Sequence, residues 1–578
     1  MDPRSAAHVL AQIAAFLELQ GASTFKVRAY EQAGRAVAAL DTDDLADLDR
    51  AGSLAATPGV GPATLAVIRD LNATGASRYL EELRADIPPG LVELLRIPGL
   101  ATAKIHLLHA SLGIDSVDAL EAAIHDGRLA TLKGFGPKTS AKLLRGIEIS
   151  RASGSLSLYH RAAMRAHALL HAVRAHADVV RAEVAGSVRR HMEVIGDADI
   201  VVACRSDPLA VAASFANAPG VRTVVRLGSA SPGITYADGS HLDLFCTRDD
   251  DFTLALWRAT GSSEHVETVI QLLARKGFTL RGDTLVNANG VAVPVDAEPD
   301  IYALIDLPFI PAEMREDGEE LLQAVRGSMP VLVEPADIRG ALHCHSDYSD
   351  GKASIAEMAD AARALGWSYI GITDHSQAAF YAGGMATEQV LAQHEEIDRL
   401  NGASPDVRIL KGIEADILAD GALDYDAGLL DRFDFVVGSI HSRFAMDRAR
   451  MTDRVLRALD DPHLTILGHP TGRLLLSRDP FPIDIDAVLE KAVALGVAVE
   501  LNADPKRLDL DWRILRRAKA LGATIAIGPD AHSTRGLETM NIGVGIARKA
   551  GIEADDVLNA RAGGDVLAFA RARRAAVR

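Results

Sequence analysis

The stretch GSVRRHMEVIGDAD, residues 186–199, sets a glycine–serine pair ahead of two alternating aspartates, Asp197 and Asp199. The apolar run IVVA at 200–203 follows directly and predicts a strand. Because residues i and i+2 of a strand point to the same face, the two carboxylates converge. Hard oxygen ligands held in this way suit two Mg²⁺ ions, and two ions suit an in-line phosphoryl transfer.

Other residues near this stretch fit the same chemistry. Asp243, in the strand-like run LDLF at 242–245, is a candidate third carboxylate. Gly186 and Ser187 can offer a backbone N–H and a hydroxyl to a triphosphate, and Arg190 can neutralise the charge that develops on it. An Asp-x-Asp spacing alone is more often a turn pair, but the Gly-Ser pair and the third strand acid favour a metal site.

Upstream, the first 150 residues read as short helices separated by three similar turns: PGVGP at 58–62, PGLA at 98–101 and GFGPK at 134–138. A Gly-x-Gly turn at a helix N-terminus exposes backbone N–H groups that bind a phosphate without reading base sequence. A single such turn is more often an ordinary helix connection, but three such turns favour binding to a DNA backbone. The second turn is the weakest, since Ala101 stands where a glycine is expected. The candidate DNA contacts are Gly59, Gly61, Gly99, Gly134, Gly136 and Lys138.

From residue 340 onward, strand and helix patterns alternate, which predicts a parallel sheet closed into a barrel. The predicted strands include 369–372, 435–438, 464–467, 497–500 and 524–527. Histidines and acids come just after such strands, at the rim where barrels of this kind place their chemistry.

These histidines and acids form the richest candidate site of the chain. His-x-His at 343–345 puts two imidazoles on one strand face, and imidazoles mixed with carboxylates suit Zn²⁺, Mn²⁺ or Fe²⁺. A water between such ions is deprotonated near neutral pH and attacks phosphorus. A lone histidine is more often a satisfied core residue, whereas so many at strand ends predict a metallophosphoesterase. The candidate ligands are His343, His345, Asp350, His375, Glu414, His441, His469, Asp530 and His532.

Composition limits the remaining possibilities. The 578 residues exceed one hydrophobic core and predict three to five domains, with 48% hydrophobic and 24% charged residues as in globular proteins. No apolar run is long enough for a membrane span, and the start MDPR lacks the apolar core of a signal peptide. Three widely spaced cysteines predict reduced thiols in the cytoplasm. The net charge of −17 argues against non-specific DNA binding, although metal sites themselves consume carboxylates.

The first part of the chain, residues 1–316, resembles the family X DNA polymerases of the nucleotidyltransferase superfamily. The segment 186–199 resembles their palm, TGS at 260–262 with DIY at 300–302 and LPFIP at 307–311 resembles their thumb, and FKVRAY at 25–30 resembles their N-terminal domain. The resemblance implies that Asp197, Asp199 and Asp243 carry two catalytic Mg²⁺ or Mn²⁺ ions and that Asp243 helps to activate the primer 3′-hydroxyl. It also implies that the incoming triphosphate is held by Gly186, Ser187, Arg190, Gly261 and Ser262.

Three positions depart from the family pattern. The family has Tyr-Phe before Thr-Gly-Ser, where this chain has Arg258 and Ala259. The Asn that reaches the base edge falls at Val266, and the lysine that some members use as a lyase nucleophile falls at Val67. Sugar discrimination, base contact and lyase chemistry are therefore expected to be weakened.

Residues from 340 to about 570 resemble the polymerase and histidinol phosphatase (PHP) domain, a distorted (β/α)₇ barrel, with all nine ligand positions of its three-metal form occupied. Such domains occur fused to bacterial family X polymerases. There they typically supply a Mn²⁺-dependent 3′→5′ exonuclease. The resemblance therefore implies up to three Mn²⁺, Zn²⁺ or Fe²⁺ ions.

The expected fold is multidomain: a helix-hairpin-helix region, an α+β palm and thumb, and an α/β PHP barrel. The expected segments are an N-terminal helical domain at 1–80, a fingers-like domain at 81–150, a palm at 151–252, a thumb at 253–316, a linker at 317–339 and the PHP domain at 340–578.

The expected function is a monomeric cytoplasmic DNA repair enzyme, active in base excision repair. It would fill gaps with dNTPs and trim 3′ ends on gapped or nicked duplex DNA. One alternative is a PHP nuclease, for 3′-end processing or AP-site cleavage, whose weakened polymerase half serves as a DNA platform. A non-catalytic DNA scaffold conflicts with the two complete ligand sets. A small-molecule phosphatase conflicts with the hairpins, because a small substrate needs no DNA clamp.

Overall fold

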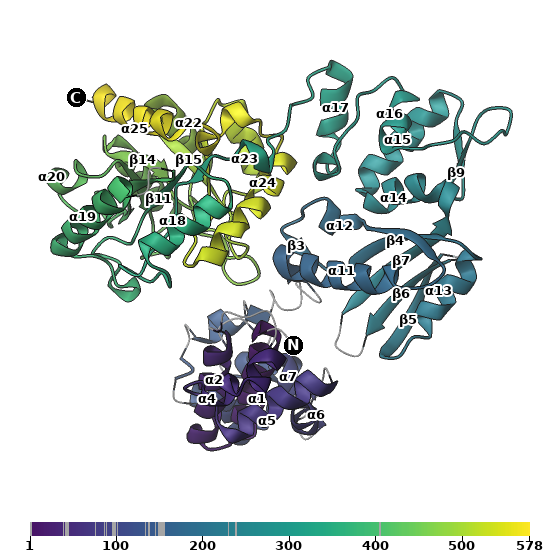
Figure 1. Ribbon diagram of the computed structural model, residues 1–578, viewed down its shortest axis with the longest axis horizontal. Helices are drawn as coiled ribbons and strands as arrows, with labels where there is room; N and C mark the ends of the chain where they lie inside the picture. The colour runs from purple at the N-terminus through teal and green to yellow at the C-terminus, as the bar shows by residue number, and fades with distance from the viewer. Residues whose placement is uncertain are drawn as a thin grey trace. The chain divides into compact units, whose positions relative to one another are not determined.

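The computed structural model describes residues 3–577 with short gaps at 39, 41–44, 75–76, 86, 88, 95–96, 98–99, 101, 133, 137–138, 145, 148–155, 229, 237–239 and 404–405. The chain divides into two compact units, Met1–Gly154 and Ser155–Arg578, shown as ribbons in Figure 1. Each unit is described by itself below.

The first unit is a bundle of short helices around one hydrophobic core. Buried residues from both of the predicted helical domains, 1–80 and 81–150, belong to this one core; examples are Leu10, Leu71, Ile105 and Leu120. Ser116 caps one helix by accepting a hydrogen bond from the N–H of Ala119 at 3.2 Å, as expected for a helix N-cap. The labelled helices are α1 (Pro3–Leu19), α2 (Thr24–Ala38), α3 (Leu45–Arg50), α4 (Ser53–Ala56), α5 (Pro62–Thr74), α6 (Arg78–Ala85), α7 (Pro89–Leu94), α8 (Thr102–Leu112), α9 (Val117–His125) and η1 (Arg128–Thr131).

The second unit begins with the palm, a five-stranded sheet in the order β2-β4-β7-β6-β5. Helices α11 and α13 cover one face and α14 covers the other, because alternate residues of β4 are buried on opposite sides. The predicted strands are confirmed; β6 was not predicted because Pro232 and Gly233 interrupt its apolar pattern. The palm elements are β1 (Ser157–Leu158), α11 (Tyr159–Arg174), β2 (Val179–Val184), α12 (Gly186–Arg189), β3 (Val194–Ile195), β4 (Ala198–Cys204), α13 (Pro208–Ala216), β5 (Val221–Gly228), β6 (Ser231–Tyr236), β7 (His241–Arg248) and η2 (Asp249–Asp251).

The thumb follows with its own small core around Trp257 and Tyr302. The segment 317–339, predicted as a linker, contains the helix α17, whose Leu321 and Ala324 join this core. A buried hydrogen bond of 2.7 Å between His265 Nδ1 and Glu320 Oε1 also ties α17 to the thumb. The elements are α14 (Phe252–Thr260), α15 (Ser263–Arg275), β8 (Thr279–Arg281), β9 (Thr284–Val286), α16 (Glu298–Ala303), η3 (Ala312–Met314), α17 (Glu319–Arg326) and η4 (Pro335–Asp337).

The last part of the second unit is a seven-stranded parallel sheet in sequence order from β10 to β16. A parallel bridge between Cys344 and Ala531 joins the ends of the first and last strands, so the predicted barrel is confirmed. The strands are β10 (Gly340–Ala341), β11 (Tyr369–Ile372), β12 (Arg408–Asp416), β13 (Phe435–Ser439), β14 (Leu464–Leu467), β15 (Ala498–Asn502) and β16 (Ile525–Gly528).

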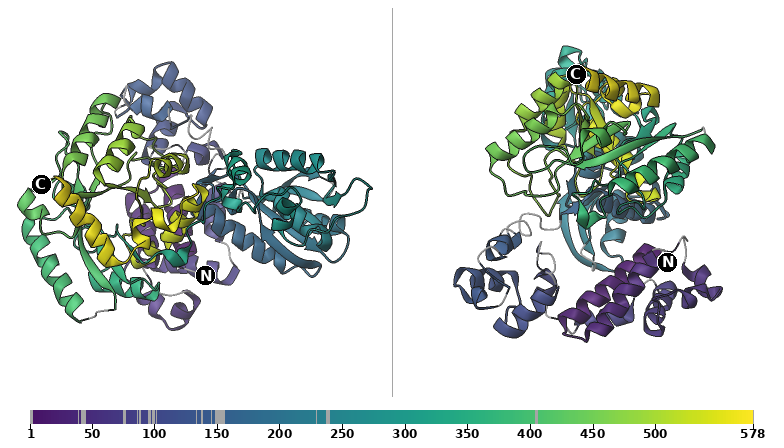
Figure 2. Two further views of the ribbon diagram at one scale, coloured as in Figure 1. Left: turned by 90° about the horizontal axis from the view of Figure 1, so that it is seen from above. Right: turned by 90° about the vertical axis from the view of Figure 1, so that its left-hand side faces the viewer.

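Helices surround this barrel, and the last one lies across it (Figure 2). Val566, Leu567 and Ala570 of this helix, α25, pack with residues near the strand starts such as Tyr369 and Leu410, which closes the end opposite the predicted ligands. The helices are α18 (Ile355–Ala364), η5 (Phe380–Ala382), α19 (Thr387–Ala403), α20 (Ala427–Leu430), α21 (Arg448–Asp460), α22 (Ile485–Leu495), α23 (Trp512–Ala520), η6 (Thr534–Thr539), α24 (Met540–Lys549), η7 (Ala554–Asp556), η8 (Leu558–Ala560) and α25 (Gly563–Val577). Among the described residues, none of the helices combines the length and apolarity that a membrane span requires.

Candidate metal centres

The palm brings its three predicted carboxylates to one end of two neighbouring strands. Asp199 on β4 lies directly opposite Asp243 on β7 in the parallel register, and Asp197 precedes β4. Gly186 has φ +57°, and a Cβ there would lie 1.7 Å from Asp199 Oδ2. Only glycine therefore allows the turn before α12 to approach this carboxylate so closely.

The electrostatics of the palm end favour the binding of a cation. Burial, with the added negative charge of Asp197 and Asp243, raises the pKa of Asp199 to about 7. Burial and Asp197 also raise the pKa of Asp243. The buried Ser187 Oγ has no hydrogen-bond partner among the described residues, as expected for an atom that faces a ligand, whereas Asp243 Oδ1 lies 3.0 Å from His241 Nε2. Carboxylate oxygens of this kind fit Mg²⁺ or Mn²⁺.

Four of the five predicted nucleotide contacts line an open pocket of about 800 Å³ beside these carboxylates. Gly186, Ser187, Arg190 and Gly261 line this pocket. Ser262 is instead held by the last residue of the thumb, since its Oγ donates to the Glu316 carbonyl at 2.6 Å.

Of the four residues that depart from the family pattern, three line the nucleotide pocket and the fourth is buried in the first unit. Arg258 lines the same pocket, but its Nη1 lies 2.6 Å from Asp283 Oδ1 and also donates to the Gly282 carbonyl. Ala259 and Val266 line the pocket. Val67 lies in the core of the first unit with 5% of its surface exposed.

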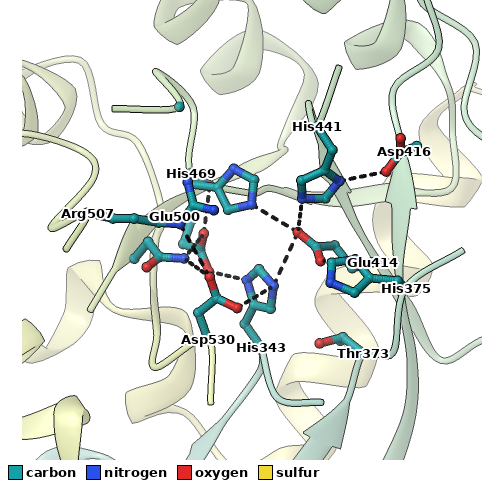
Figure 3. Close-up of polar contacts among 12 residues, drawn as sticks. His343, Thr373, His375, Glu414, Asp416, His441, His469, Glu500, Arg507 and Asp530 are labelled. Atoms are coloured by element: carbon teal, nitrogen blue, oxygen red, sulfur yellow. Dashed lines mark hydrogen bonds and ion pairs between the residues drawn. The ribbon is translucent and has the colours of Figure 1, made fainter. Parts of the chain in front are cut away.

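The barrel brings together all nine of its predicted ligands, most of which are shown in Figure 3. Glu414, at the end of β12, lies at the centre and is 1% exposed. Its Oε1 lies 3.0 Å from His469 Nε2, 3.2 Å from His441 Nε2 and 3.4 Å from His343 Nε2.

Eight of the nine predicted ligands also fall into three overlapping groups, each with its ligand atoms within 4.8 Å of one another. Among the described residues these groups are His345, Asp350, His375 and His532; His343, His345 and Asp530; and His375, Glu414 and His441. The palm aspartates are not among such groups in the described chain. The donor set of the barrel fits Mn²⁺, Zn²⁺ or Fe²⁺.

Protonated imidazoles balance the carboxylates of the barrel. Burial alone would lower the pKa of His441, but Glu414 and Asp416 raise it to about 10. The same balance of burial against Asp350 and Asp530 raises the pKa of His532 to about 9. Burial would raise the pKa of Glu414, but the neighbouring imidazoles hold it well below its ordinary value. Because a metal ligand must be a neutral imidazole, metal binding here displaces protons.

A second layer of residues, which the sequence reasoning missed, orients the imidazoles. Glu500 accepts a hydrogen bond of 2.6 Å from His343 Nδ1, and Asp416 accepts one of 2.6 Å from His441 Nδ1. Such partners fix the ring orientation and leave the other nitrogen for the metal. Asp416 could have been found from its spacing, because it follows Glu414 by two residues on the same strand.

The hairpin turns are described in part. Gly59 and Gly134 have φ of +95° and +94°, which favours glycine at both. Gly136 has open space where a Cβ would stand, whereas the N–H of Gly61 is bonded to Thr64 Oγ1 at 2.9 Å. Gly99 and Lys138 lie outside the described residues.

Together these features define a class: a helical hairpin unit, followed by a palm with clustered carboxylates and a histidine-rich barrel suited to phosphoester chemistry. The Helix-hairpin-helix domain family matches residues 1–77, the DNA polymerase beta thumb family matches 255–316 and the PHP domain family matches 341–502. The chain is 36% identical over 575 residues to "DNA polymerase/3′-5′ exonuclease PolX" of Bacillus subtilis (strain 168), which covers 98% of this chain and 99% of that protein.

Two shorter relatives match part of the chain. A protein named "Probable phosphatase" from Thermoanaerobacter sp. (strain X514) is 32% identical over 27% of this chain and 66% of its own length. Another of that name, from Syntrophotalea carbinolica, is 27% identical over 38% of this chain and 90% of its own length. The full-length match shows that this chain belongs to the family X DNA polymerases that carry a C-terminal PHP domain.

Proposed function

We propose that this protein fills gaps in DNA as a template-directed polymerase and trims 3′ ends as a 3′→5′ exonuclease. The single observation that carries the proposal is the complete ligand set of the barrel, beside an intact aspartate set in the palm of the same chain. A full-length relative named for both activities supports it.

In the polymerase centre, Asp197, Asp199 and Asp243 would hold two Mg²⁺ or Mn²⁺ ions. When bound, such ions neutralise the triphosphate and make the primer 3′-hydroxyl more acidic. Arg190 binds the triphosphate as a planar cation, and Ser187 Oγ, which has no protein partner, donates a hydrogen bond to a phosphate oxygen. The hairpin glycines other than Gly61, whose N–H is bonded to Thr64 Oγ1, hold the DNA backbone through their N–H groups.

In the exonuclease centre, the nine predicted ligands would hold up to three Mn²⁺, Zn²⁺ or Fe²⁺ ions. When bound, these ions acidify a water and neutralise the phosphodiester. Glu500 and Asp416 hold the Nδ1–H groups of His343 and His441, so that both Nε2 atoms face Glu414. Arg507, whose Nε lies 3.6 Å from Asp530 Oδ2, adds positive charge beside the centre.

The remaining parts of the proposal concern the substrate and setting. Gapped or nicked duplex DNA, its 3′ ends and dNTPs are the substrates, and the protein acts as a monomer in the cytoplasm during base excision repair. The hairpin and thumb matches support DNA over a small phosphate ester as the substrate.

A second candidate is a PHP nuclease whose polymerase half serves mainly to bind DNA. The surroundings of Arg258 favour it, because this side chain is tied to Asp283 beside the nucleotide pocket and Ala259 offers no aromatic surface to a sugar.

One experiment separates the two candidates. The full chain is incubated with a one-nucleotide-gapped duplex labelled on the primer, with dNTPs and either Mg²⁺ or Mn²⁺. The proposal predicts primer lengthening with dNTPs and shortening without them. Shortening in all conditions, with no lengthening at any dNTP concentration, would establish the second candidate.

A further inference from the structure

Arg190 of the palm is held by two residues of the thumb, Glu316 and Thr260. Its Nε donates to Glu316 Oε1 at 2.8 Å, and its Nη1 donates to the carbonyl of Thr260. The carbonyl of Glu316 accepts a hydrogen bond from Ser262 Oγ at 2.6 Å. Glu316 therefore contacts two of the residues predicted to bind the incoming triphosphate.

A residue of the barrel completes this cluster. Lys549, the last residue of α24, places its Nζ 2.5 Å from the same Glu316 Oε1. The Nζ also lies 3.0 Å from the carbonyl of Arg190 and 3.3 Å from that of Glu313. All three acceptors belong to the palm or to the end of the thumb, so the three donors of the ammonium are all directed out of the barrel.

The burial of Lys549 makes its charge effective. Its side chain is 0% exposed, while that of Glu316 is 12% exposed. Burial lowers the pKa of Lys549 to about 8, and Glu316 opposes the shift. Charges in such a site interact more strongly than in water because the surrounding dielectric constant is low.

The charge balance of the cluster decides how Arg190 meets a triphosphate. Arg190, Lys549 and Glu316 together carry a net charge of +1, which attracts a triphosphate. Without Lys549 the pair of Arg190 and Glu316 is neutral, and the carboxylate competes with the triphosphate for the guanidinium. Glu316 shared between two cations holds Arg190 in place without neutralising the site.

We propose that Lys549 of the PHP barrel is a positioning residue of the polymerase nucleotide site, acting through Glu316 on Arg190. The inference rests on the proposed polymerase function. It makes the barrel a part of the machinery that binds the incoming nucleotide, in addition to its own chemistry.

The test is Lys549→Met in the full chain, with single-nucleotide incorporation into a one-nucleotide gap. We expect the KM for the dNTP to rise about 10-fold, as for the loss of a contact to a charged group, while kcat changes less than about threefold. Lys549→Gln, which keeps N–H donors for the two carbonyls but carries no charge, should raise KM to the same extent. The rate of 3′ trimming should stay at the wild-type value in both variants.

A double variant tests the route through Glu316. Adding Glu316→Gln to Lys549→Met leaves Arg190 as the only charge of the cluster and should return KM to within about threefold of wild type. A KM in the double variant that is as high as in Lys549→Met, or higher, would contradict the proposal.

Arg548→Met is the matched control. Arg548 precedes Lys549 on α24 and pairs with Glu313 at 2.8 Å and Glu334 at 2.6 Å, at the same boundary; among the described residues its ion-pair partners do not include Glu316. It should leave KM unchanged. An equal rise in KM for Arg548→Met would mean that any loosening of this boundary has the effect, which would overturn the role of Lys549.

Equilibrium binding supplies a readout that does not depend on catalysis. Fluorescence titration with a dATP analogue carrying a methylanthraniloyl group should give a Kd about 10-fold weaker for Lys549→Met. A wild-type protein that neither binds this probe nor extends a primer would overturn the proposed function and this inference with it. A wild-type protein that does both, with an unchanged KM and Kd in Lys549→Met, would overturn this inference alone.

Discussion

Glu414 is the residue on which the barrel centre depends most. Five imidazoles, those of His343, His345, His375, His441 and His469, lie within 3.7 Å of its carboxylate, which is 1% exposed. Its ionised form persists because those imidazoles lower its pKa against the effect of burial. The orientations of His343 and His441 in turn depend on Glu500 and Asp416 behind them.

Asp416→Asn tests this second layer. The amide can still accept from His441 Nδ1 but carries no charge, so we expect metal affinity and exonuclease kcat/KM to fall about 10- to 100-fold. Metal content after dialysis and the trimming rate measure the effect. Asp398→Asn is the control, because Asp398 pairs with Lys411 on the surface with 67% of its side chain exposed. Wild-type metal retention in Asp416→Asn would contradict the assignment.

Asp199 makes the stability of the metal-free palm depend on pH. Its folded pKa of about 7 lies above the ordinary value of 3.8, so its contribution to stability is complete below about pH 4 and is lost as the pH rises through 7. Asp199→Asn removes this loss. In a chelator, the thermal unfolding midpoint of the variant minus that of wild type should become more positive from pH 5 to pH 8. A difference that stays constant or falls over this range would contradict the buried cluster of like charges.

Ala259 predicts weak selection of the nucleotide sugar. It lines the pocket without an aromatic ring, and Arg258 beside it is tied to Asp283. An open pocket of this kind discriminates only on the order of 10²-fold against an added hydroxyl. Incorporation opposite C in a one-nucleotide gap compares kcat/KM for dGTP and GTP. A ratio well above about 10³ would show that the backbone excludes the ribose 2′-hydroxyl, and Ala259→Phe should then change this ratio little.

At the scale of elements, the sequence predicted the strands that are set by a local run of apolar residues. The strands 200–203, 369–372 and 435–438 are apolar runs, and they form β4, β11 and β13. The ligands followed from their positions at strand ends, where the barrel topology brings them together.

Residues whose partners lie far along the chain could not be found in this way. Glu500 contacts His343 across 157 positions, and Lys549 contacts Glu316 across 233. No spacing rule links such pairs, because tertiary packing alone brings them together. A lysine at the end of a helix is ordinarily solvated and stabilises the helix dipole, so the pattern around Lys549 predicts an exposed residue.

Gly186→Ala tests the turn between β2 and α12 as an element of the polymerase centre. The new methyl group meets Asp199 Oδ2 at 1.7 Å in a backbone with φ +57°, so the turn or the carboxylate must move. A displacement of about 1 Å can lower a rate by on the order of 10²-fold, and we expect this loss in kcat/KM for dNTP addition. Trimming serves as the internal control. Addition at the wild-type rate would show that the turn does not position Asp199.

At the scale of the whole molecule, palm, thumb and barrel form one compact unit. A buried ion pair between Arg473 and Glu193, at 3.1 Å, joins the barrel to the palm. Arg473 follows the predicted ligand His469 by four residues, and Glu193 precedes Asp197 by four. The two centres nevertheless draw their ligands from separate sheets, which predicts two activities that can be removed one at a time.

The most direct measurement compares two double variants on one gapped, primer-labelled duplex. Asp197→Ala with Asp199→Ala should abolish dNTP addition and trim at the wild-type rate. His345→Ala with His375→Ala should lose trimming and barrel-bound metal and keep dNTP addition. Loss of both activities in either folded variant, or trimming that persists without the two histidines, would contradict a chain with two separate metal centres.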